Sequence, residues 1–336
     1  MLSPVIRKLR RQAACLGMTF LALGGLACAQ PATRPAERSF LTIVMLPDTQ
    51  HYSRKWPESF LAQTEWVRRN RDRENIVFVT HVGDVVNDRN KDMNEWDVAD
   101  KALSRLDGVV PWGVALGNHD FAASKEGARD ARGFLQHFGP QRFKGLPWYG
   151  GASPNGLSSY QLFSGAGTDF VILHLEMEAP DASLAWADDV LRRYPRRAAI
   201  VTTHSYLKGR DGVGRSVEKG KGEGLNSGEE IWCKLIRNHP QIFLVLCGHV
   251  QATVEYHQVS TNDAGNKVAE ILADYQRRHN GGDGWLRLIR IVPAAGEIEV
   301  RTYSPVLNEF ETDSDSQFVV PFELPGACRK GAAPAA

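Results

Sequence analysis

The sequence has little of what marks several broad classes of protein. It contains only 5 cysteines in 336 residues, which indicates no disulfide scaffold. Its 40 basic and 39 acidic residues leave a net charge of +1. No nucleic-acid-binding surface is therefore expected, because binding to a phosphate backbone needs concentrated Lys and Arg. The sequence also contains no internal repeat and no coiled-coil pattern, and its 43% of hydrophobic residues are typical of a globular protein with a large core.

The N-terminus has the order of a secretory signal peptide over residues 1–29. Basic residues at positions 7–11 precede an apolar stretch over residues 13–27, and Ala27-Cys28-Ala29 offers small residues for cleavage. The apolar stretch is too short for a good membrane-spanning helix, so we expect no transmembrane segment in a mature chain that is secreted or periplasmic. Lipidation of Cys28 is the alternative, and it would produce an envelope lipoprotein with a lipid anchor at that residue.

The rest of the chain is predicted to form a linker, one domain and a tail. Residues 30–39, rich in Pro and Ala, read as the linker, and residues 40–325 as the domain. Strands and helices alternate in the first half, whereas the C-terminal third is mostly strand. That order predicts two mixed sheets packed face to face with helices outside. Residues 326–336, rich in Ala, Gly and Pro, are predicted to be a disordered tail.

Local patterns within this domain predict four helical segments and one loop with many basic residues. Pro57 suits the first turn of a helix over 57–70, and Ser227 with Glu230 has the spacing of a capping box. Ser183 is predicted to be the N-cap of a further helix that ends near residue 194, and 95–106 is a fourth amphipathic segment. The Gly-rich segment 208–228 carries five basic residues and is expected to be a loop, either solvated or closing over a phosphate.

Five short polar motifs each follow a run of apolar residues. The motifs are Asp48-Thr49-Gln50, Gly83-Asp84, Gly117-Asn118-His119-Asp120, Thr203-His204 and Gly248-His249-Val250-Gln251. The runs before them, predicted to be buried strands, cover residues 41–46, 76–79, 114–116, 198–201 and 242–246. Ligands of open α/β sheets bind at the carboxyl edge of the strands, and carboxylate, carboxamide and imidazole groups bind divalent metals. The pattern therefore favours a metal-dependent hydrolase.

The ordered motifs resemble those of the calcineurin-like metallophosphoesterase superfamily. Segments 232–249, 273–276, 284–287 and 301–305 are also similar to an exported bacterial branch of it. The resemblance implies a four-layer α/β/β/α sandwich with two mixed β-sheets. It also implies a phosphate-ester substrate, either a phosphomonoester or a phosphodiester, attacked by a hydroxide that bridges two divalent metal ions. The sequence leaves the ions open among Mn, Fe, Zn, Mg and Ca.

The resemblance assigns a role to each motif. The residues assigned to metal are Asp48, Gln50, Asp84, Asn118, His204, His249 and Gln251. Asp84 would bridge the two ions, the Asn and the two His would complete one site, and Asp48 with the two Gln would form the other. His119 would protonate the leaving group or hold the phosphate, with Asp120 orienting its imidazole. Further candidates to line the substrate pocket are Asp274, Tyr275, Asn280 and Asp283.

Gln50 and Gln251 depart from the family pattern, which has histidine at both positions. Because a carboxamide binds metal through a neutral, harder oxygen, the second site should have less affinity for Zn²⁺ and should favour Mn²⁺, Mg²⁺ or Ca²⁺. If the two replacements abolish efficient turnover, the protein would instead be a catalytically weak metal- or phosphate-binding module.

Overall fold

The computed structural model describes residues 39–88, 93–122, 129–208, 214–220, 222–251 and 255–324. The predicted signal peptide, the Cys28 lipidation site, nearly all of the predicted linker and the predicted tail lie outside these residues. Within the described ranges, no helix is long and apolar enough to cross a membrane.

The first sheet is centred on β1 (Leu41–Leu46) and has the strand order β13-β12-β11-β1-β2-β3, with β14 paired to β12. Its other strands are β2 (Ile76–His81), β3 (Trp112–Val114), β11 (Leu286–Val292), β12 (Glu297–Ser304), β13 (Glu309–Glu311) and β14 (Gln317–Pro321). β1, β2 and β3 are parallel, whereas β11 runs antiparallel to β1. The sheet is therefore mixed, as predicted.

The second sheet has the strand order β4-β5-β6-β7-β8-β10-β9. The strands are β4 (Tyr149–Ala152), β5 (Ser159–Gly165), β6 (Thr168–His174), β7 (Ala198–Thr202), β8 (Ile242–Cys247), β9 (Glu255–Thr261) and β10 (Lys267–Ala273). The four strands from β6 to β10 along the sheet are parallel, and antiparallel strands lie at both edges. This sheet is mixed as well.

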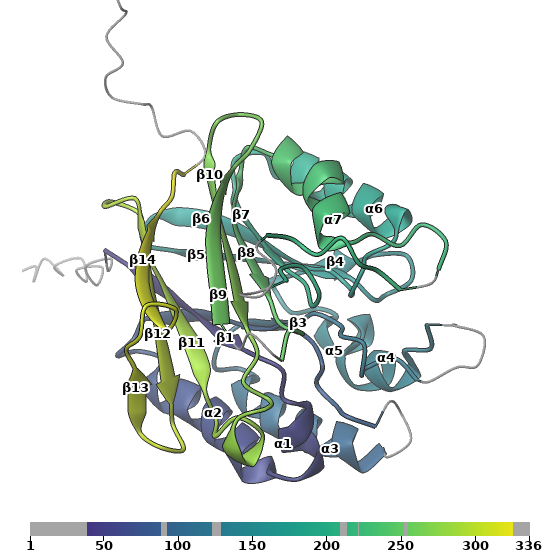
Figure 1. Ribbon diagram of the computed structural model, residues 1–336, viewed down its shortest axis with the longest axis vertical. Coiled ribbons are helices and arrows are strands. Elements are labelled where there is room, and N and C mark those ends of the chain that lie inside the picture. Colours follow the sequence, from purple (N-terminus) through teal and green to yellow (C-terminus); the bar gives the residue numbers. More distant parts are fainter. Residues whose placement is uncertain are drawn as a thin grey trace, which may run out of the picture. The chain divides into compact units, whose positions relative to one another are not determined.

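Helices cover the outer face of each sheet (Figure 1). The α-helices are α1 (Gln50–Arg54), α2 (Pro57–Asn70), α3 (Met93–Leu103), α4 (Arg132–Phe138), α5 (Pro140–Phe143), α6 (Asp181–Arg193) and α7 (Gly228–Lys234). The short 3₁₀ helices are η1 (Ser104–Leu106), η2 (Ile236–Asn238) and η3 (His279–Gly281). In Figure 1, α2 and α3 lie beside the first sheet, and α6 and α7 lie beside the second.

Alternation of side chains along β1 shows how the layers are held together. Val44 and Leu46 join an apolar cluster with residues of α2 and α3, whereas Ile43 and Met45 join a cluster with residues of β6 and β7 in the second sheet. A third cluster fills the space between the second sheet and helices α6 and α7. Successive strand residues point to opposite faces, so one buried strand serves two cores. The four-layer α/β/β/α fold is confirmed.

Local signals predicted several of these elements well. β1 and α2 have the predicted bounds, and both hydrogen bonds of the Ser227–Glu230 capping box are present at the start of α7. The prediction for Ser183 is wrong: Pro180 is the N-cap of α6, and the Ser183 hydroxyl donates a hydrogen bond to Glu176. The third strand was predicted over residues 114–116, whereas β3 covers Trp112–Val114.

Candidate metal centre

The five motifs lie at the carboxyl ends of strands from both sheets. Motifs after β1, β2 and β3 come from parallel strands of the first sheet, and those after β7 and β8 come from parallel strands of the second. Because the sheets pack face to face, side chains from the two edges meet. His204 after β7, for example, places Nε2 at 3.3 Å from Oδ1 of Asp84 after β2.

Three donor atoms surround Nε2 of His204. It lies 3.2 Å from Asn118 Oδ1, 3.3 Å from Asp84 Oδ1 and 3.2 Å from His249 Nδ1. Ligand atoms bonded to one ion at about 2.1 Å are roughly 3.0 to 3.4 Å apart in octahedral or tetrahedral geometry. The cluster therefore has the spacing and the donor types of a divalent-metal site, and Asp84, His204 and His249 form a group able to hold an ion.

Hydrogen bonding orients the His204 ring for this role. Its Nδ1–H donates to the carbonyl oxygen of Val82 at 3.0 Å, which leaves Nε2 with a lone pair when the ring is neutral. Burial alone would lower the pKa of His204, but Asp84 and Asp48 outweigh it and raise that pKa to about 10. Without a metal the ring therefore holds a proton, which a divalent cation would displace on binding.

The backbone around the cluster is strained and closely packed. Asp84 and His249 both have left-handed conformations, with φ of 52° and 76°, which non-glycine residues rarely adopt outside functional sites. A Cβ on Gly117 would lie 2.3 Å from Asp84 Oδ1, and one on Gly248 would lie 2.2 Å from Asp48 Oδ2. Glycine is therefore required at both positions, because the motif backbones press against the carboxylates of Asp84 and Asp48.

Asp48 and Gln50 lie beside this cluster. The Asp48 carboxylate accepts a hydrogen bond from the His249 amide at 3.2 Å. Burial, together with the negative charge of Asp274, raises the pKa of Asp48 well above its usual range. Gln50 is buried, and its Oε1 has no hydrogen-bond partner in the described structure. A buried carboxylate and a carboxamide oxygen without a partner are both stabilised by a nearby cation, so Asp48 and Gln50 are compatible with a second, hard divalent ion.

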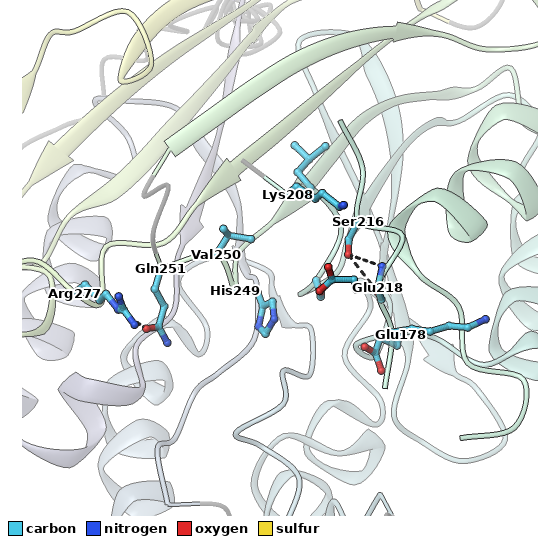
Figure 2. A pocket seen from close by; sticks show the side chains of 11 residues that line it. Glu178, Lys208, Ser216, Glu218, His249, Val250, Gln251 and Arg277 are labelled. Carbon is cyan, nitrogen blue, oxygen red and sulfur yellow. Dashed lines mark hydrogen bonds between the residues drawn. The ribbon is translucent and has the colours of Figure 1, made fainter. Parts of the chain in front are cut away.

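Gln251 is placed differently from the other predicted ligands. Its Oε1 accepts a hydrogen bond from Nε of Arg277 at 2.6 Å, and Figure 2 shows its side chain beside that guanidinium, apart from the His249 ring. The structure thus brings Asp84, Asn118, His204 and His249 together, with Asp48 bonded to the His249 amide, and leaves Gln251 at the rim of the cavity described below. Its role as a ligand stays a prediction.

His119 is held by a backbone group that the sequence did not reveal. Its Nδ1–H donates to the carbonyl oxygen of Asn87 at 2.7 Å, so Nε2 is the ring nitrogen left for substrate. The expected contact from Asp120 to this ring is wrong, since the Asp120 carboxylate accepts hydrogen bonds from the amides of Gly117, Val85 and Val86. Asp120 therefore ties the second and third motifs together.

A cavity of about 690 Å³ opens beside His249 (Figure 2). Lys208 and Arg277 are among its basic residues, and Glu178 and Glu218 are its acidic ones. No Phe, Tyr or Trp is among the described residues that line it. The basic loop contributes Lys208 to the cavity, whereas Arg215 of that loop stacks over Trp232 at 3.8 Å and serves the fold.

The fold and the site together are those of the metal-dependent phosphoesterases. The chain belongs to the calcineurin-like phosphoesterase family, whose model matches residues 41–252. Members of this family use a dimetal centre, and Asp84, His204 and His249 form a group that could hold a metal ion.

The chain is also similar to individual proteins. It is 34% identical over 288 residues to the uncharacterized protein YvnB of Bacillus subtilis, an alignment that covers 83% of this chain and 21% of YvnB. The chain thus spans about a fifth of that relative. A dimetal phosphatase from Danio rerio shares the fold, with a TM-score of 0.50 and 12% identity over 84% of this chain and 99% of that one. GAP50, the anchor in the inner membrane complex of Plasmodium, has a TM-score of 0.49 and 13% identity over 85% of this chain and 90% of that one.

Proposed function

We propose that the protein hydrolyses a phosphomonoester or phosphodiester with the help of two divalent metal ions. The observation that carries this proposal is the convergence of Asp84, Asn118, His204 and His249 within a 3.2 to 3.3 Å network around one ring nitrogen. When bound, the ions supply a water of lowered pKa and neutralise charge on the phosphoryl oxygens.

The chain's own residues supply the remaining steps. Asp84 would be the ligand shared by both ions. Its Oδ1 also accepts a hydrogen bond from the His119 amide at 2.8 Å, which holds the third motif against the metal ligands. His119, held through Nδ1, can present Nε2–H to the leaving oxygen or to a phosphoryl oxygen. The cavity beside His249 receives the alcohol part of the ester. Its charged lining, with Lys208 and Arg277, favours a polar alcohol part over an aromatic one.

Hydrolysis of paired chromogenic mono- and diesters by purified protein, with metal content measured in the same samples, tests the proposal. Wild type should hydrolyse at least one substrate and respond to added Mn²⁺ or Mg²⁺. Asp84→Asn should lose metal and activity, whereas Asp263→Asn, an exposed carboxylate paired with Arg237, should retain both. A wild-type rate that ignores metal, with an active Asp84→Asn variant, would contradict the proposal.

A catalytically weak binding module is the second candidate, and the engagement of Gln251 by Arg277 favours it. In that case the purified protein should bind two ions and inorganic phosphate but turn over neither substrate under any metal condition.

We further propose that the protein is exported and that its mature chain begins near Gln30, with a lipid anchor at Cys28 as the alternative. The basic, apolar and small-residue order of the N-terminus supports this, and so does the resemblance to an exported branch. N-terminal sequencing of protein from the native host tests it. A chain that retains Met1 in the cytosol would contradict it.

A further inference from the structure

The segment between β10 and β11, residues 274–285, lies against the first motif although none of the five family motifs includes it. Nδ1–H of His51 donates a hydrogen bond to the carbonyl oxygen of Gln276 at 3.0 Å. The amide of Gly284 donates one to the Tyr52 hydroxyl at 2.8 Å. Both partners belong to α1, whose first residue is also the last residue of the first motif. The segment is therefore fixed beside the candidate metal centre.

The backbone of the second half of this segment is strained. Five consecutive residues, 280–284, have positive φ between 43° and 119°, and two of them, Asn280 and Asp283, are not glycines. Non-glycine residues keep this unfavourable conformation only where the surrounding structure imposes it, and such places are concentrated at functional sites. Here the Ser304 hydroxyl donates to the carbonyl oxygen of Asp283 at 2.5 Å. The segment is thus held in one conformation beside the site.

Two consecutive arginines of this segment have different environments. Arg278 is partly buried and forms ion pairs with Glu311 at 2.6 Å and Glu255 at 3.4 Å, so it serves the fold. Arg277 is exposed and lines the cavity beside His249. It is not paired with a carboxylate of any described residue. A guanidinium with an uncompensated charge at the wall of a cavity is suited to bind an anion.

One hydrogen bond orients the guanidinium of Arg277. Its Nε donates to Oε1 of Gln251 at 2.6 Å, and its two terminal nitrogens have no partner among the described residues. Held through Nε, the guanidinium presents these nitrogens as a planar fork that matches two oxygens of one phosphoryl or carboxylate group. Because the carboxamide of Gln251 is neutral, it holds the guanidinium without cancelling the positive charge.

The surroundings of this fork favour an anion on its side of the cavity. In Figure 2, Arg277 and Gln251 lie on one side of the His249 ring, whereas the acidic residues of the cavity, Glu178 and Glu218, lie on the other. His249 belongs to the group that could hold a metal ion. A phosphate ester bound at that group would therefore enter the cavity that Arg277 lines.

We infer that Arg277 binds a phosphoryl group of the substrate through its two terminal nitrogens, and that Gln251 positions it for this contact. The inference rests on the proposed function, which brings a phosphate ester to the cavity, and it adds a specificity-determining residue to that function. The phosphoryl group is either the one that is hydrolysed or a second one on the alcohol part, since both offer the same pair of oxygens.

Calorimetric titration of the Mn²⁺-loaded full-length protein tests this inference without turnover. The probes are inorganic phosphate and propanediol bisphosphate, which carries a second phosphoryl group. Arg277→Ala should weaken binding of at least one probe by about 10- to 100-fold, because a charged, bidentate hydrogen bond is lost. Arg277→Lys should recover only part of this loss, since it keeps the charge without the fork.

Arg196→Ala is the matched control. Arg196 is exposed in the turn that precedes β7, at the end of that strand opposite to His204, so its removal changes the net charge equally and should leave both affinities unchanged. Mn²⁺ content measured in every sample should stay at the wild-type level, because Arg277 contacts no metal ligand of the described group.

The role of Gln251 is tested by a double-mutant cycle. Gln251→Leu removes the acceptor at similar size and should weaken the same probe by about three- to tenfold. In the Arg277→Ala background it should cause no further loss, because Gln251 acts through the guanidinium. Additive losses would overturn the positioning role.

The two probes also separate the possible sources of the phosphoryl group. An equal loss for both probes in Arg277→Ala identifies the group that is hydrolysed, and a loss for the bisphosphate alone identifies a second one. Wild-type affinity of Arg277→Ala for both probes would overturn the inference. If wild type binds neither probe and hydrolyses no ester, the proposed function fails, and the inference fails with it. A loss of affinity in Arg277→Ala without turnover in wild type would uphold the inference and contradict only the hydrolase.

Discussion

Replacing Gly117 with alanine should disable the metal centre without removing any ligand. The new Cβ would lie 2.3 Å from Oδ1, 2.4 Å from the backbone nitrogen and 2.9 Å from Cγ of Asp84. Carbon does not approach such atoms closer than about 3.0 Å, so the carboxylate must move by roughly 0.7 Å. Coordination distances tolerate deviations of about 0.2 Å, and a displacement of 1 Å can cost about 100-fold in rate. We therefore expect a loss of about 100-fold in kcat/KM.

The pattern of metal loss should follow which carboxylate is displaced. Because Asp84 is predicted to bridge both ions, Gly117→Ala should weaken both steps of a Mn²⁺ titration. Gly248→Ala places its Cβ 2.2 Å from Asp48 Oδ2 and should weaken only the second step. Gly108→Ala is the control. That glycine has a φ of 72° and open space around it, so the change should cost about 1 kcal/mol of stability and leave metal binding intact. Wild-type metal affinity in a folded Gly117→Ala protein would refute this reasoning.

Three other variants probe separate features. His119→Gln should retain both ions while kcat falls by about 10² to 10⁴-fold, and an unchanged rate at full metal occupancy would remove His119 from the mechanism. Gln251→His should raise Zn²⁺ affinity at the second site in competition calorimetry by about tenfold or more; no change would place residue 251 outside the coordination sphere. Burial lowers the pKa of His174 from 6.5 to about 3, so an unfolded chain takes up a proton that the folded one refuses. Stability should be complete above pH 6.5 and decline toward pH 3 by about 1.4 kcal/mol per pH unit. Urea unfolding of metal-free protein should show a shallower decline in His174→Gln, and equal slopes would contradict the assignment.

Features that depend on neighbouring residues along the chain could be predicted from the sequence. The apolar run of β1, the start of α2 at Pro57 and the capping box at Ser227 and Glu230 all follow local rules. Prediction was weaker where distant contacts compete with local preference. Ser183 has the residue type of an N-cap, but its hydroxyl bonds instead to Glu176, which follows β6, and the helix begins earlier.

The environment of His119 and Asp120 shows a second kind of limit. The group that holds the imidazole is the main-chain carbonyl of Asn87, and every residue type has such a carbonyl, so no sequence pattern marks it. Asp120 is buried by the packing of two motif loops, which, with the charge of Asp84, raises its pKa to about 7. Its bonds to the amides of Val85 and Val86 form only when those loops lie together.

The sequence by itself determined which donors the protein has and their order along the chain, because apolar strands followed by Asp, Asn, His or Gln are written in consecutive residues. Only the tertiary structure decided which donors meet. Packing the two sheets face to face brings Nε2 of His204 from one sheet within 3.3 Å of Oδ1 of Asp84 from the other. The same packing turns Gln251 toward Arg277. Such contacts join residues far apart in the chain, and they depend on sheet register and close packing, which no local pattern specifies.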